Sequence, residues 1–342
     1  MYNIPYHIEK DLSTTNFLVT GGAGFIGSNL VEYLLKFGAG KVKVLDNFST
    51  GSHQNLENFS FYNSFELIEG DIRNLADCRK AVEGVHIIFH EAAMEIDSQS
   101  IDEALVTNDV NINGFLNILV AAKEAGVKRI VYAASSSAYG DNTDLPKVEE
   151  KIGKPLSPYA ITKYVNELYA DVFQRLYGLE FIGLRYFNVF GSKQNKNAKH
   201  VAVIPQFISS LMAHEEPTIY GNGKNTRDFT FIENVVQANI IAALTTKSIA
   251  INQVYNVACG EQTSLNELAI LVRDQLADID PMIAGIHFHY AEEKNGEVAH
   301  SVASITKAKH LLGYFPYFSL AEGLSETIKE YVDVYKSAVI SS

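Results

Sequence analysis

A tyrosine and a lysine four positions apart are the residues of this sequence with the clearest chemical potential. They are Tyr159 and Lys163, in the segment SPYAITK (157–163). On a helix, residues at positions i and i+4 share one face. A phenol with a pKa of about 10 is a poor base at neutral pH, but a nearby ammonium favours the phenolate. Tyr159 is therefore a candidate acid/base that takes a proton from a substrate hydroxyl.

Three serines stand upstream of this pair, at the end of the apolar run RIVYAASS (129–136). A serine hydroxyl at a strand end can hydrogen-bond the same substrate hydroxyl as Tyr159. Ser135 is the predicted third catalytic residue, and Ser136 is predicted to contact the substrate or to hold the turn. Without this context, the Tyr-x-x-x-Lys spacing would indicate two unrelated residues on a helix surface.

A glycine turn, TGGAGFIG (20–27), follows the apolar run FLVT and opens an apolar-periodic stretch. Gly21, Gly24 and Gly27 permit a tight turn, close approach to a pyrophosphate, and close packing of helix on strand. The pyrophosphate would lie on the helix N-terminus, whose first turn contains Phe25 and Ile26, because unpaired N–H groups there favour an anion. The alternative is a glycine turn that serves packing alone.

Two carboxylates end the next two predicted strands. Asp46, followed by Asn47, can accept hydrogen bonds from a ribose diol and would repel a 2′-phosphate, so NAD is favoured over NADP. Asp71 is predicted to hydrogen-bond the adenine amino group, with Ile72 packing on the ring. The alternative for Asp71 is a strand-end aspartate that caps a helix.

Apolar runs alternate with helical patterns from Asn16 onward, which predicts an α/β fold built on a Rossmann-type doubly wound parallel sheet. The predicted strands are 17–20, 41–46, 65–71, 86–93, 129–136, 181–188 and 252–258. The predicted helices include 102–125, 157–178, 229–244, 264–277 and 320–336.

Two domains are expected. The NAD-binding domain would comprise 1–187 with returning segments at about 229–258, and a smaller C-terminal α/β domain would bind the substrate with 188–228 and 259–342. The stretch 188–228 is rich in Asn, Lys, Gly and Gln, which indicates long functional loops.

The helix predicted at 157–178 carries two apolar stripes. One stripe is Ile161, Tyr164, Leu168, Val172 and Leu176, and the other is Val165, Tyr169, Phe173 and Tyr177. One stripe can face the sheet, and the second needs another cover. That cover is either the chain's own C-terminal part or the same helix of a second subunit.

The composition excludes several classes of protein. The chain has 342 residues, 47% of them hydrophobic, and a net charge of −12, so nucleic acid is a disfavoured partner. No apolar run approaches the roughly 20 residues of a membrane span, and the polar start does not resemble a signal peptide. The two distant cysteines suit a reducing, cytoplasmic location. The ten histidines show no ligand spacing, so no metal is expected, and His90 and His300 are interpreted as packing residues.

Taken together, the motifs TGGAGFIG, GDIRN, AASSSAYGD, SPYAITK, LRYFNVFG and TRDFTFIENV resemble the extended short-chain dehydrogenase/reductase superfamily. The chain looks most like NAD-dependent nucleotide-sugar epimerases, in particular bacterial UDP-N-acetylglucosamine 4-epimerases of surface-polysaccharide pathways. The resemblance implies catalysis by Tyr159, Lys163 and Ser135, and a homodimer formed through a four-helix bundle. It also implies cofactor contacts at Ala92 and Asn111 and substrate contacts at Asn188, Tyr220 and Arg227.

The sequence departs from the family pattern in three places. Lys294 stands in a segment that usually carries an arginine, and lysine lacks the bidentate fork for a diphosphate. Glu95 and Asp97 enter a loop that is usually neutral, where Glu95 contacts the substrate if its side chain faces the sugar and otherwise points to solvent. Glu91 stands where an uncharged residue is usual and is interpreted as cover for the strand end. Ser301 is small, which would leave room for an N-acetyl group.

The resemblance implies NAD-dependent 4-epimerisation of a UDP-sugar through a transient 4-keto intermediate. The expected substrates are UDP-GlcNAc and UDP-GalNAc or their uronic acids. One alternative is a nucleotide-sugar 4,6-dehydratase on the same fold, although such dehydratases usually carry Asp-Glu where this chain has Ser136 and Ser137. The other is a non-catalytic NAD-binding scaffold, which the intact Tyr159 and Lys163 disfavour.

Overall fold

A computed structural model describes residues 2–7, 10–94, 97–194, 202–292 and 299–340. Its centre is a seven-stranded sheet in the order β11-β6-β5-β4-β1-β2-β3, and every neighbouring pair is parallel. The strands are β1 (Asn16–Thr20), β2 (Lys41–Asp46), β3 (Phe65–Glu69), β4 (Ile87–His90), β5 (Arg129–Ser135), β6 (Glu180–Tyr186) and β11 (Gln253–Val257). The predicted Rossmann-type sheet is confirmed.

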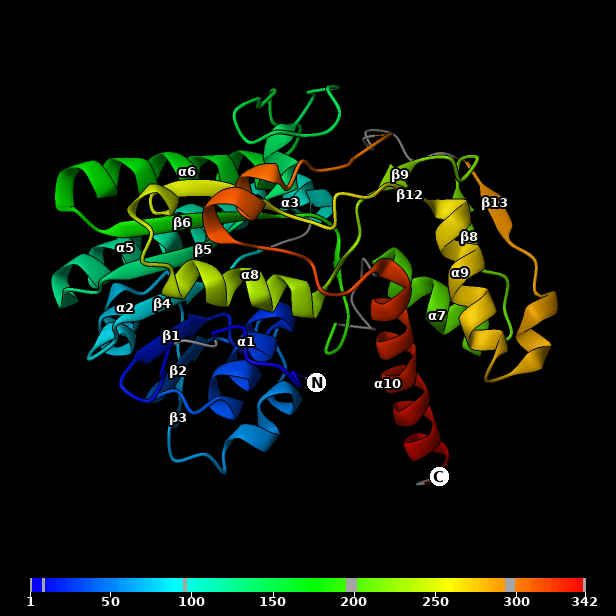
Figure 1. Ribbon diagram of the computed structural model, residues 1–342, viewed down its shortest axis with the longest axis horizontal. Coiled ribbons are helices and arrows are strands. Elements are labelled where there is room, and N and C mark those ends of the chain that lie inside the picture. The colour runs from blue at the N-terminus through cyan, green and yellow to red at the C-terminus, as the bar shows by residue number, and fades with distance from the viewer. Residues whose placement is uncertain (1, 8–9, 95–96, 195–201, 293–298, 341–342) are drawn as a thin grey trace.

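Helices cover both faces of this sheet, as the continuous apolar strands require (Figure 1). The helices α1 (Phe25–Lys36) and α8 (Ile232–Leu244) bury their apolar side chains in one core, against Phe17 and Val19. The helices α2 (Leu75–Val82) and α5 (Gly114–Ala125) build the second core on the other face, against Leu18. Strand β1 lies between β2 and β4, where the strand order reverses, and ligands of such sheets bind beyond the carboxyl ends of the strands at that point.

The segment predicted as one helix over 102–125 is divided. It comprises the end of α3 (Asp97–Asp102), α4 (Ala104–Asn108), a π-helical turn (Asp109–Asn113) and α5. The first break falls at Glu103, whose backbone (φ −120°, ψ 41°) is not helical. The spacing of apolar residues does not reveal such changes in helical pitch. These changes are frequent at functional sites.

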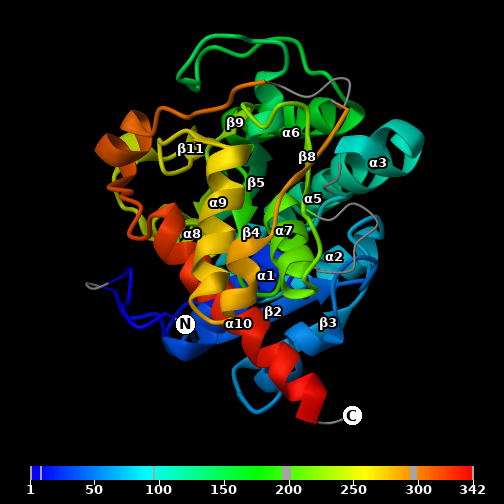
Figure 2. The same ribbon diagram turned by 90° about the vertical axis from the view of Figure 1, so that its right-hand side faces the viewer.

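A second group of elements stands beside the sheet in Figure 1 and lies in front of it in Figure 2. It contains α7 (Val203–Met212), α9 (Leu265–Ala277) and α10 (Leu320–Ile340), and the short strands β7 (Val189–Phe190), β8 (Thr218–Tyr220), β9 (Thr226–Arg227), β10 (Thr230–Phe231), β12 (Thr263–Ser264) and β13 (His289–Ala291). These strands pair two by two, as β10-β7, β12-β9 and β13-β8. The expectation of loops over 188–228 is therefore wrong for its described part, which contains α7 and β7 to β9. The division into two domains at the boundaries given above stays a prediction.

The helix α6 (Pro158–Tyr177) turns a polar face to the sheet, which the two apolar stripes did not predict. Its buried residues are Tyr159, Ala160, Thr162, Lys163, Asn166, Glu167 and Ala170. On the second stripe, Tyr169 and Phe173 pack against the second core. On the first, Ile161, Leu168, Val172 and Leu176 are exposed, so the described C-terminal part does not cover them.

A buried ion pair anchors this polar face. Arg185 on β6 donates two hydrogen bonds to the Glu167 carboxylate, at 2.8 and 2.7 Å, and a third to the Glu149 carbonyl. Arg185 is 2% exposed and Glu167 is 9% exposed. If one partner were removed, the remaining charge would have neither its ion partner nor bulk water around it. Removing one partner of such a pair is costly because the other charge stays buried.

We expect Glu167→Ala to lower the free energy of unfolding by about 3–5 kcal/mol. The matched control is Asp171→Ala, one turn further along α6, because Asp171 pairs with Arg175 at 2.7 Å but both side chains are more than 60% exposed. The control should cost less than about 1 kcal/mol. Urea unfolding of the three proteins measures both values, and equal losses in the two variants would contradict the buried pair's role.

Candidate active site

A cavity of about 1810 Å³ lies at the carboxyl edge of the sheet. It extends from the glycine turn to the Tyr159–Lys163 pair, although these segments are more than 130 residues apart in the chain. Of the predicted site residues, its lining includes Gly21, Gly24, Phe25, Ile26, Gly27, Asp46, Asn47, Asp71, Ile72, Ala92, Ser135, Ser136, Tyr159, Lys163 and Asn188. The fold therefore brings most of the predicted residues to one hollow.

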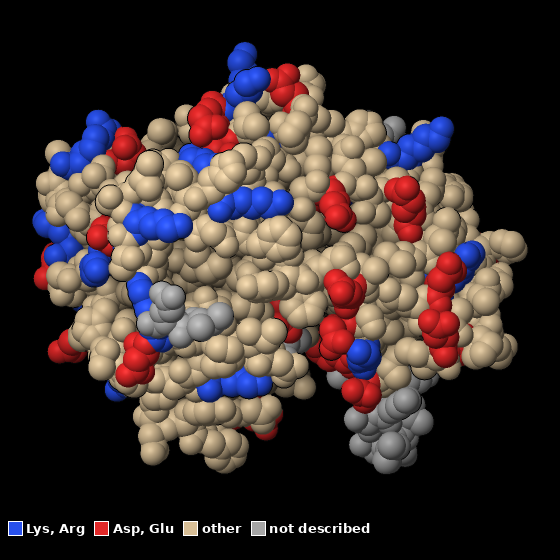
Figure 3. Space-filling model, viewed as in Figure 1, with Lys and Arg blue, Asp and Glu red and all other residues tan. Residues whose placement is uncertain are grey.

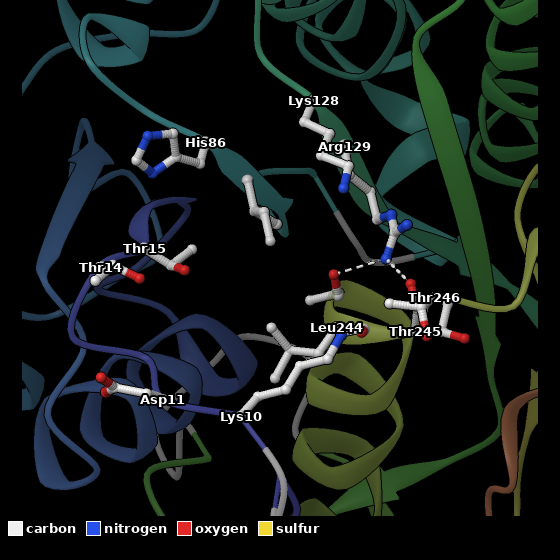
Figure 4. A pocket seen from close by; sticks show the side chains of 12 residues that line it. Lys10, Asp11, Thr14, Thr15, His86, Lys128, Arg129, Leu244, Thr245 and Thr246 are labelled. Carbon is white, nitrogen blue, oxygen red and sulfur yellow. Dashed lines mark hydrogen bonds between the residues drawn. The ribbon is translucent and has the colours of Figure 1, made fainter.

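A smaller hollow of about 530 Å³ lies near the amino ends of β4 and β5 (Figure 4). Its central cation, Arg129, points at the end of α8 and donates to the carbonyls of Ala242, Ala243 and Thr245, while it also pairs with Glu180. Cations favour helix C-termini, so this hollow is explained by the capping of α8. The larger cavity is the candidate active site.

The glycine turn leaves the start of α1 open to the cavity. Gly21 has φ +68° and its N–H bonds Leu45, while a Cβ there would lie 2.7 Å from the Ala92 nitrogen. A Cβ on Gly27 would lie 2.2 Å from the Gly21 carbonyl oxygen. Gly24 caps α1 without a side-chain hydrogen bond, and the first turn has no acidic residue. The free N–H groups of this turn fit the diphosphate of a dinucleotide.

Asp46 ends β2 beside this turn. Its carboxylate accepts hydrogen bonds from the backbone N–H groups of Ala23 and Phe48, each at 2.8 Å. Burial raises the pKa of this carboxyl against the lowering effect of the two N–H bonds. The carboxylate thus holds the glycine turn, and its predicted contact with a ribose stays a prediction.

Asp71 lies in a network at the same edge. Its carboxylate accepts hydrogen bonds from the Arg73 side chain, the Arg73 backbone N–H and the Asn47 amide. The Arg73 side chain is the main cause that lowers the pKa of Asp71 to about 2. Asn74, not Asp71, caps α2, so the helix-capping alternative is wrong. Adenine binding by Asp71 and Ile72 stays a prediction.

Tyr159 and Lys163 lie in the first two turns of α6. The Lys163 Nζ atom is 5.7 Å from the centre of the Tyr159 ring and donates to the Ala133 carbonyl at 2.8 Å. The Ser157 hydroxyl caps the helix by accepting from the Ala160 N–H. Ser135 ends β5 on the same cavity wall, where its hydroxyl accepts from the Ser137 N–H at 3.1 Å. A phenol, an ammonium and a hydroxyl therefore line the same cavity.

His90 lies beneath this wall and is only 3% exposed. Its Nδ1 atom is 2.9 Å from the Thr20 hydroxyl. Burial, and then the charge of Lys163, lowers the pKa of His90 to about 3. His90 is thus neutral at physiological pH, in agreement with its interpretation as a packing residue, and Lys163 supplies the positive charge next to Tyr159.

Asn111 is buried in the π-helical turn and does not line the cavity. Its side chain accepts from the Met94 N–H and donates to the Met94 carbonyl and to the Thr162 hydroxyl. It therefore ties the segment after β4 to α6, next to Lys163. A direct contact with the nicotinamide stays a prediction, and the bonds seen indicate a positioning role.

The predicted substrate residues fall into three sets. Asn188 and Ser136 line the cavity. Tyr220, Arg227 and Ser301 do not, because they lie in the second group of elements, where Arg227 donates to the Ala299 carbonyl and the Ser301 N–H bonds Thr226. His300 lies beside them, with its Nδ1 atom 3.0 Å from the Thr226 hydroxyl. Lys294 and Glu95 lie outside the described residues.

Sequence reasoning missed one pair of polar residues in the cavity wall. Tyr186 ends β6 and donates a hydrogen bond from its hydroxyl to the Glu91 carboxylate at 2.9 Å. Both residues line the cavity. Glu91 had been noted only as cover for a strand end, and Tyr186 stands in the segment RYFN without any local signal. Their pairing depends on β4 and β6 lying in one sheet, which no spacing rule predicts.

The described part of the chain has neither a cluster of metal ligands nor a helix that could span a membrane. It contains no cluster of three His, Cys, Asp or Glu side chains that could hold a metal ion. None of its helices is long and apolar enough to cross a membrane. On the face seen in Figure 3, the described Lys and Arg side chains form no continuous basic surface, and acidic side chains gather over its right-hand part.

Comparison with known proteins agrees with this geometry. A putative UDP-glucose 4-epimerase from Methanocaldococcus jannaschii is 34% identical over 313 residues, which is 91% of this chain and 96% of the relative. The structure of a UDP-N-acetylglucosamine 4-epimerase from Methanobrevibacter ruminantium in complex with UDP-N-acetylmuramic acid is 36% identical, with a TM-score of 0.87 over 94% of this chain and 99% of that one. A dTDP-glucose 4,6-dehydratase from Streptomyces venezuelae with NAD bound is 28% identical, with a TM-score of 0.83 over 93% and 97% of the two chains.

The chain also matches the model of a whole family, which assigns it to that family and not only to individual relatives. The model of the NAD dependent epimerase/dehydratase family matches residues 17–258, which span the glycine turn, the Tyr159–Lys163 pair and the seven strands of the sheet except for Asn16, the first residue of β1. The resemblance found in the motifs is confirmed. The chain belongs to the NAD dependent epimerase/dehydratase family, and its cofactor is NAD.

Proposed function

We propose that this protein is a UDP-sugar 4-epimerase that interconverts UDP-GlcNAc and UDP-GalNAc or the corresponding uronic acids. The observation that carries the proposal is the convergence of Tyr159, Lys163 and Ser135 on the cavity that the glycine turn also lines. The epimerase names of the M. jannaschii and M. ruminantium relatives support the reaction.

The chemistry assigned to the chain's own residues is a proton transfer. When NAD is bound, its nicotinamide supplies a reversible acceptor for the hydride from sugar carbon 4. Tyr159 takes the proton of the 4-hydroxyl and later returns it, and Lys163 stabilises the phenolate. Ser135 orients the same hydroxyl. With NAD bound, the 4-keto sugar would turn in the cavity between the two proton transfers of Tyr159, and the overall reaction would be redox-neutral.

The residues proposed to bind the substrate are supported by fewer observations. Asn188 and Ser136 line the cavity near the proposed sugar position, and Arg227 would meet the UDP diphosphate. The small side chain of Ser301 favours an N-acetylated sugar. We also propose that the sheet with its helices binds NAD while the elements of 188–228 and 259–342 bind the nucleotide sugar, and that the enzyme acts in cytoplasmic polysaccharide biosynthesis. The free thiols of Cys78 and Cys259 support a reducing compartment.

The 4,6-dehydratase alternative starts with the same oxidation and differs in the next step. The S. venezuelae relative shows that the fold supports this reaction. Elimination of water requires both an additional acid and an additional base beside the sugar. Ser136 and Ser137 provide neither a carboxylate nor an imidazole, and Glu91, a carboxyl in the same cavity lining, can be only one of the two groups. Epimerisation is therefore favoured.

Purified protein should convert UDP-GlcNAc to UDP-GalNAc, or one uronate to the other, with products identified by NMR. We expect Tyr159→Phe to lower kcat at least about 100-fold, because the proton transfer loses its acid/base. NAD content should stay unchanged in that variant, which excludes unfolding as the cause. A 4-keto-6-deoxy product would establish the dehydratase instead, and full turnover by Tyr159→Phe would contradict the assignment.

We further propose a homodimer formed through α6. The exposed stripe of Ile161, Leu168, Val172 and Leu176 continues onto neighbouring helices, where Ile101, Leu105 and Val106 are also exposed. Helices α3 and α4 contact α6, so these exposed apolar side chains stand on adjoining helices. Clusters of exposed apolar side chains are typical of surfaces that bind another protein. Covering the stripe with the same stripe of a second subunit satisfies the symmetry of a two-fold dimer.

The native enzyme should therefore have twice the chain mass of 37.8 kDa in light scattering. We expect Leu168→Glu to shift it to the monomer, because an isologous interface places the new charge next to its symmetry mate. Ile249→Glu is the control, since Ile249 is 67% exposed and lies far from α6 in the sequence. A monomeric native protein, or dissociation caused equally by both variants, would count against this interface.

A further inference from the structure

The cavity wall carries a negative charge that the proposed chemistry does not use. Glu91 directly follows β4, and its backbone N–H bonds the Thr20 carbonyl at 3.1 Å, beside the glycine turn. The two segments touch, because a Cβ on Gly21 would lie 3.0 Å from the Glu91 carbonyl carbon. The side chain is half-buried and lines the same cavity as Tyr159 and Lys163.

A chain of hydrogen bonds holds the Glu91 side chain in the wall. Asn239 on α8 is fully buried, and its Nδ2 atom donates to the Val235 carbonyl and to the Tyr186 hydroxyl, both at 2.9 Å. The Tyr186 hydroxyl has two acceptors within reach, Glu91 Oε1 at 2.9 Å and Asn239 Oδ1 at 3.3 Å, and Glu91 is the nearer. A glutamate side chain is ordinarily a carboxylate at neutral pH, and this form accepts the bond from the phenol. The fold therefore places an acidic side chain at this position.

Two charges of opposite sign thus stand on the cavity wall that Tyr159 faces. The nicotinamide has to lie within reach of Tyr159, and its oxidised form carries a positive charge that the reduced form lacks. Lys163 favours the phenolate, but it disfavours a cationic ring nearby. A carboxylate in the same wall has the opposite effect on the ring, and charges act strongly where water is excluded.

We propose that Glu91 tunes the redox equilibrium of the bound cofactor, stabilising NAD⁺ relative to NADH and so offsetting the charge of Lys163. The consequence is a cofactor that returns its hydride readily and rests in the oxidised form between cycles. The inference depends on NAD binding and goes beyond the identity of the sugar. It applies equally if the substrate differs from the one proposed above.

The decisive measurement is the midpoint potential of the nicotinamide in the holoenzyme, without any sugar. The protein is equilibrated with a redox dye of known potential, and NADH is read by its absorbance. We expect Glu91→Gln to raise the ratio of NADH to NAD⁺ about tenfold at a fixed potential, which is about 30 mV for a two-electron couple. Glu69→Gln, an exposed carboxylate at the end of β3, is the matched control and should leave the ratio unchanged.

The Tyr186→Phe variant distinguishes an effect of the Glu91 charge from an effect of the hydrogen bond between Tyr186 and Glu91. This variant removes the hydrogen bond but keeps the Glu91 carboxylate, so its ratio should change less than threefold. An unchanged ratio in Glu91→Gln would overturn the proposal. So would equal shifts in Glu91→Gln and Tyr186→Phe, because Glu91 would then act only by holding Tyr186.

A second measurement can be interpreted even if a variant folds poorly. The dissociation constants of NAD⁺ and NADH are measured on the same preparation, and a general loss of binding cancels in their ratio. Glu91→Asp should keep the native ratio, and Glu91→Leu, a second uncharged variant, should show the same tenfold shift as Glu91→Gln. Since no sugar is present, a failure here is distinguishable from a failure of the proposed epimerisation.

Discussion

The site depends on one buried cation. Lys163 is 3% exposed, and its ammonium donates to the Ala133 carbonyl of β5. An ammonium removed from water is costly unless hydrogen bonds and neighbouring charges compensate for the loss of hydration. The carbonyl supplies part of this compensation and fixes the ammonium beside the Tyr159 ring. The same desolvation makes the charge effective, because a cation exposed to water would stabilise a phenolate far less.

The elements around α6 follow from the need to hold that cation in place. The helix begins with a serine cap, and the Ser100 hydroxyl accepts from the Tyr159 N–H at 3.1 Å. Asn111 bonds Thr162, the residue before Lys163, and the Arg185–Glu167 pair ties the next turn to β6. The helix therefore packs against the sheet through polar contacts. Each contact has a specific geometry, so the position of Tyr159 and Lys163 is more restricted than apolar packing alone would allow.

The features whose positions the sequence predicted correctly are local. The glycine turn, the carboxylates at the strand ends and the Tyr159–Lys163 spacing each lie within one strand–helix unit, and one segment is enough to interpret them. The prediction for α6 was correct in part: Tyr169 and Phe173 of one stripe pack against the second core, and the stripe of Leu168 is exposed. The polar residues of its buried face were not predicted, because apolar periodicity shows only where apolar residues lie. The helix α7 was missed because the polar composition of 188–228 concealed the short apolar segment VIPQFISSLM (203–212).

Other features of the site could not be predicted from the sequence, because the residues that pair there are distant in the chain. Glu91 and Tyr186 are 95 residues apart, and Asn111 lies 51 residues from Thr162. Such pairs become neighbours only when the order of strands is known, and the order β6-β5-β4-β1 cannot be derived from the run of apolar segments. The charge on Glu91 was visible in the sequence, but its place beside the glycine turn was not.

The opposing charges in the cavity wall also explain why a single lysine cannot serve both of its neighbours. An ammonium that stabilises a phenolate destabilises a pyridinium ring at a similar distance, so improving one function weakens the other. The protein's net charge of −12 does not resolve this conflict. Charges on the outer surface are screened over about 8 Å at physiological ionic strength. A carboxylate in the wall lies in the cavity itself, where charges interact more strongly than on the outer surface, and Glu91 follows β4 whereas Lys163 stands on α6.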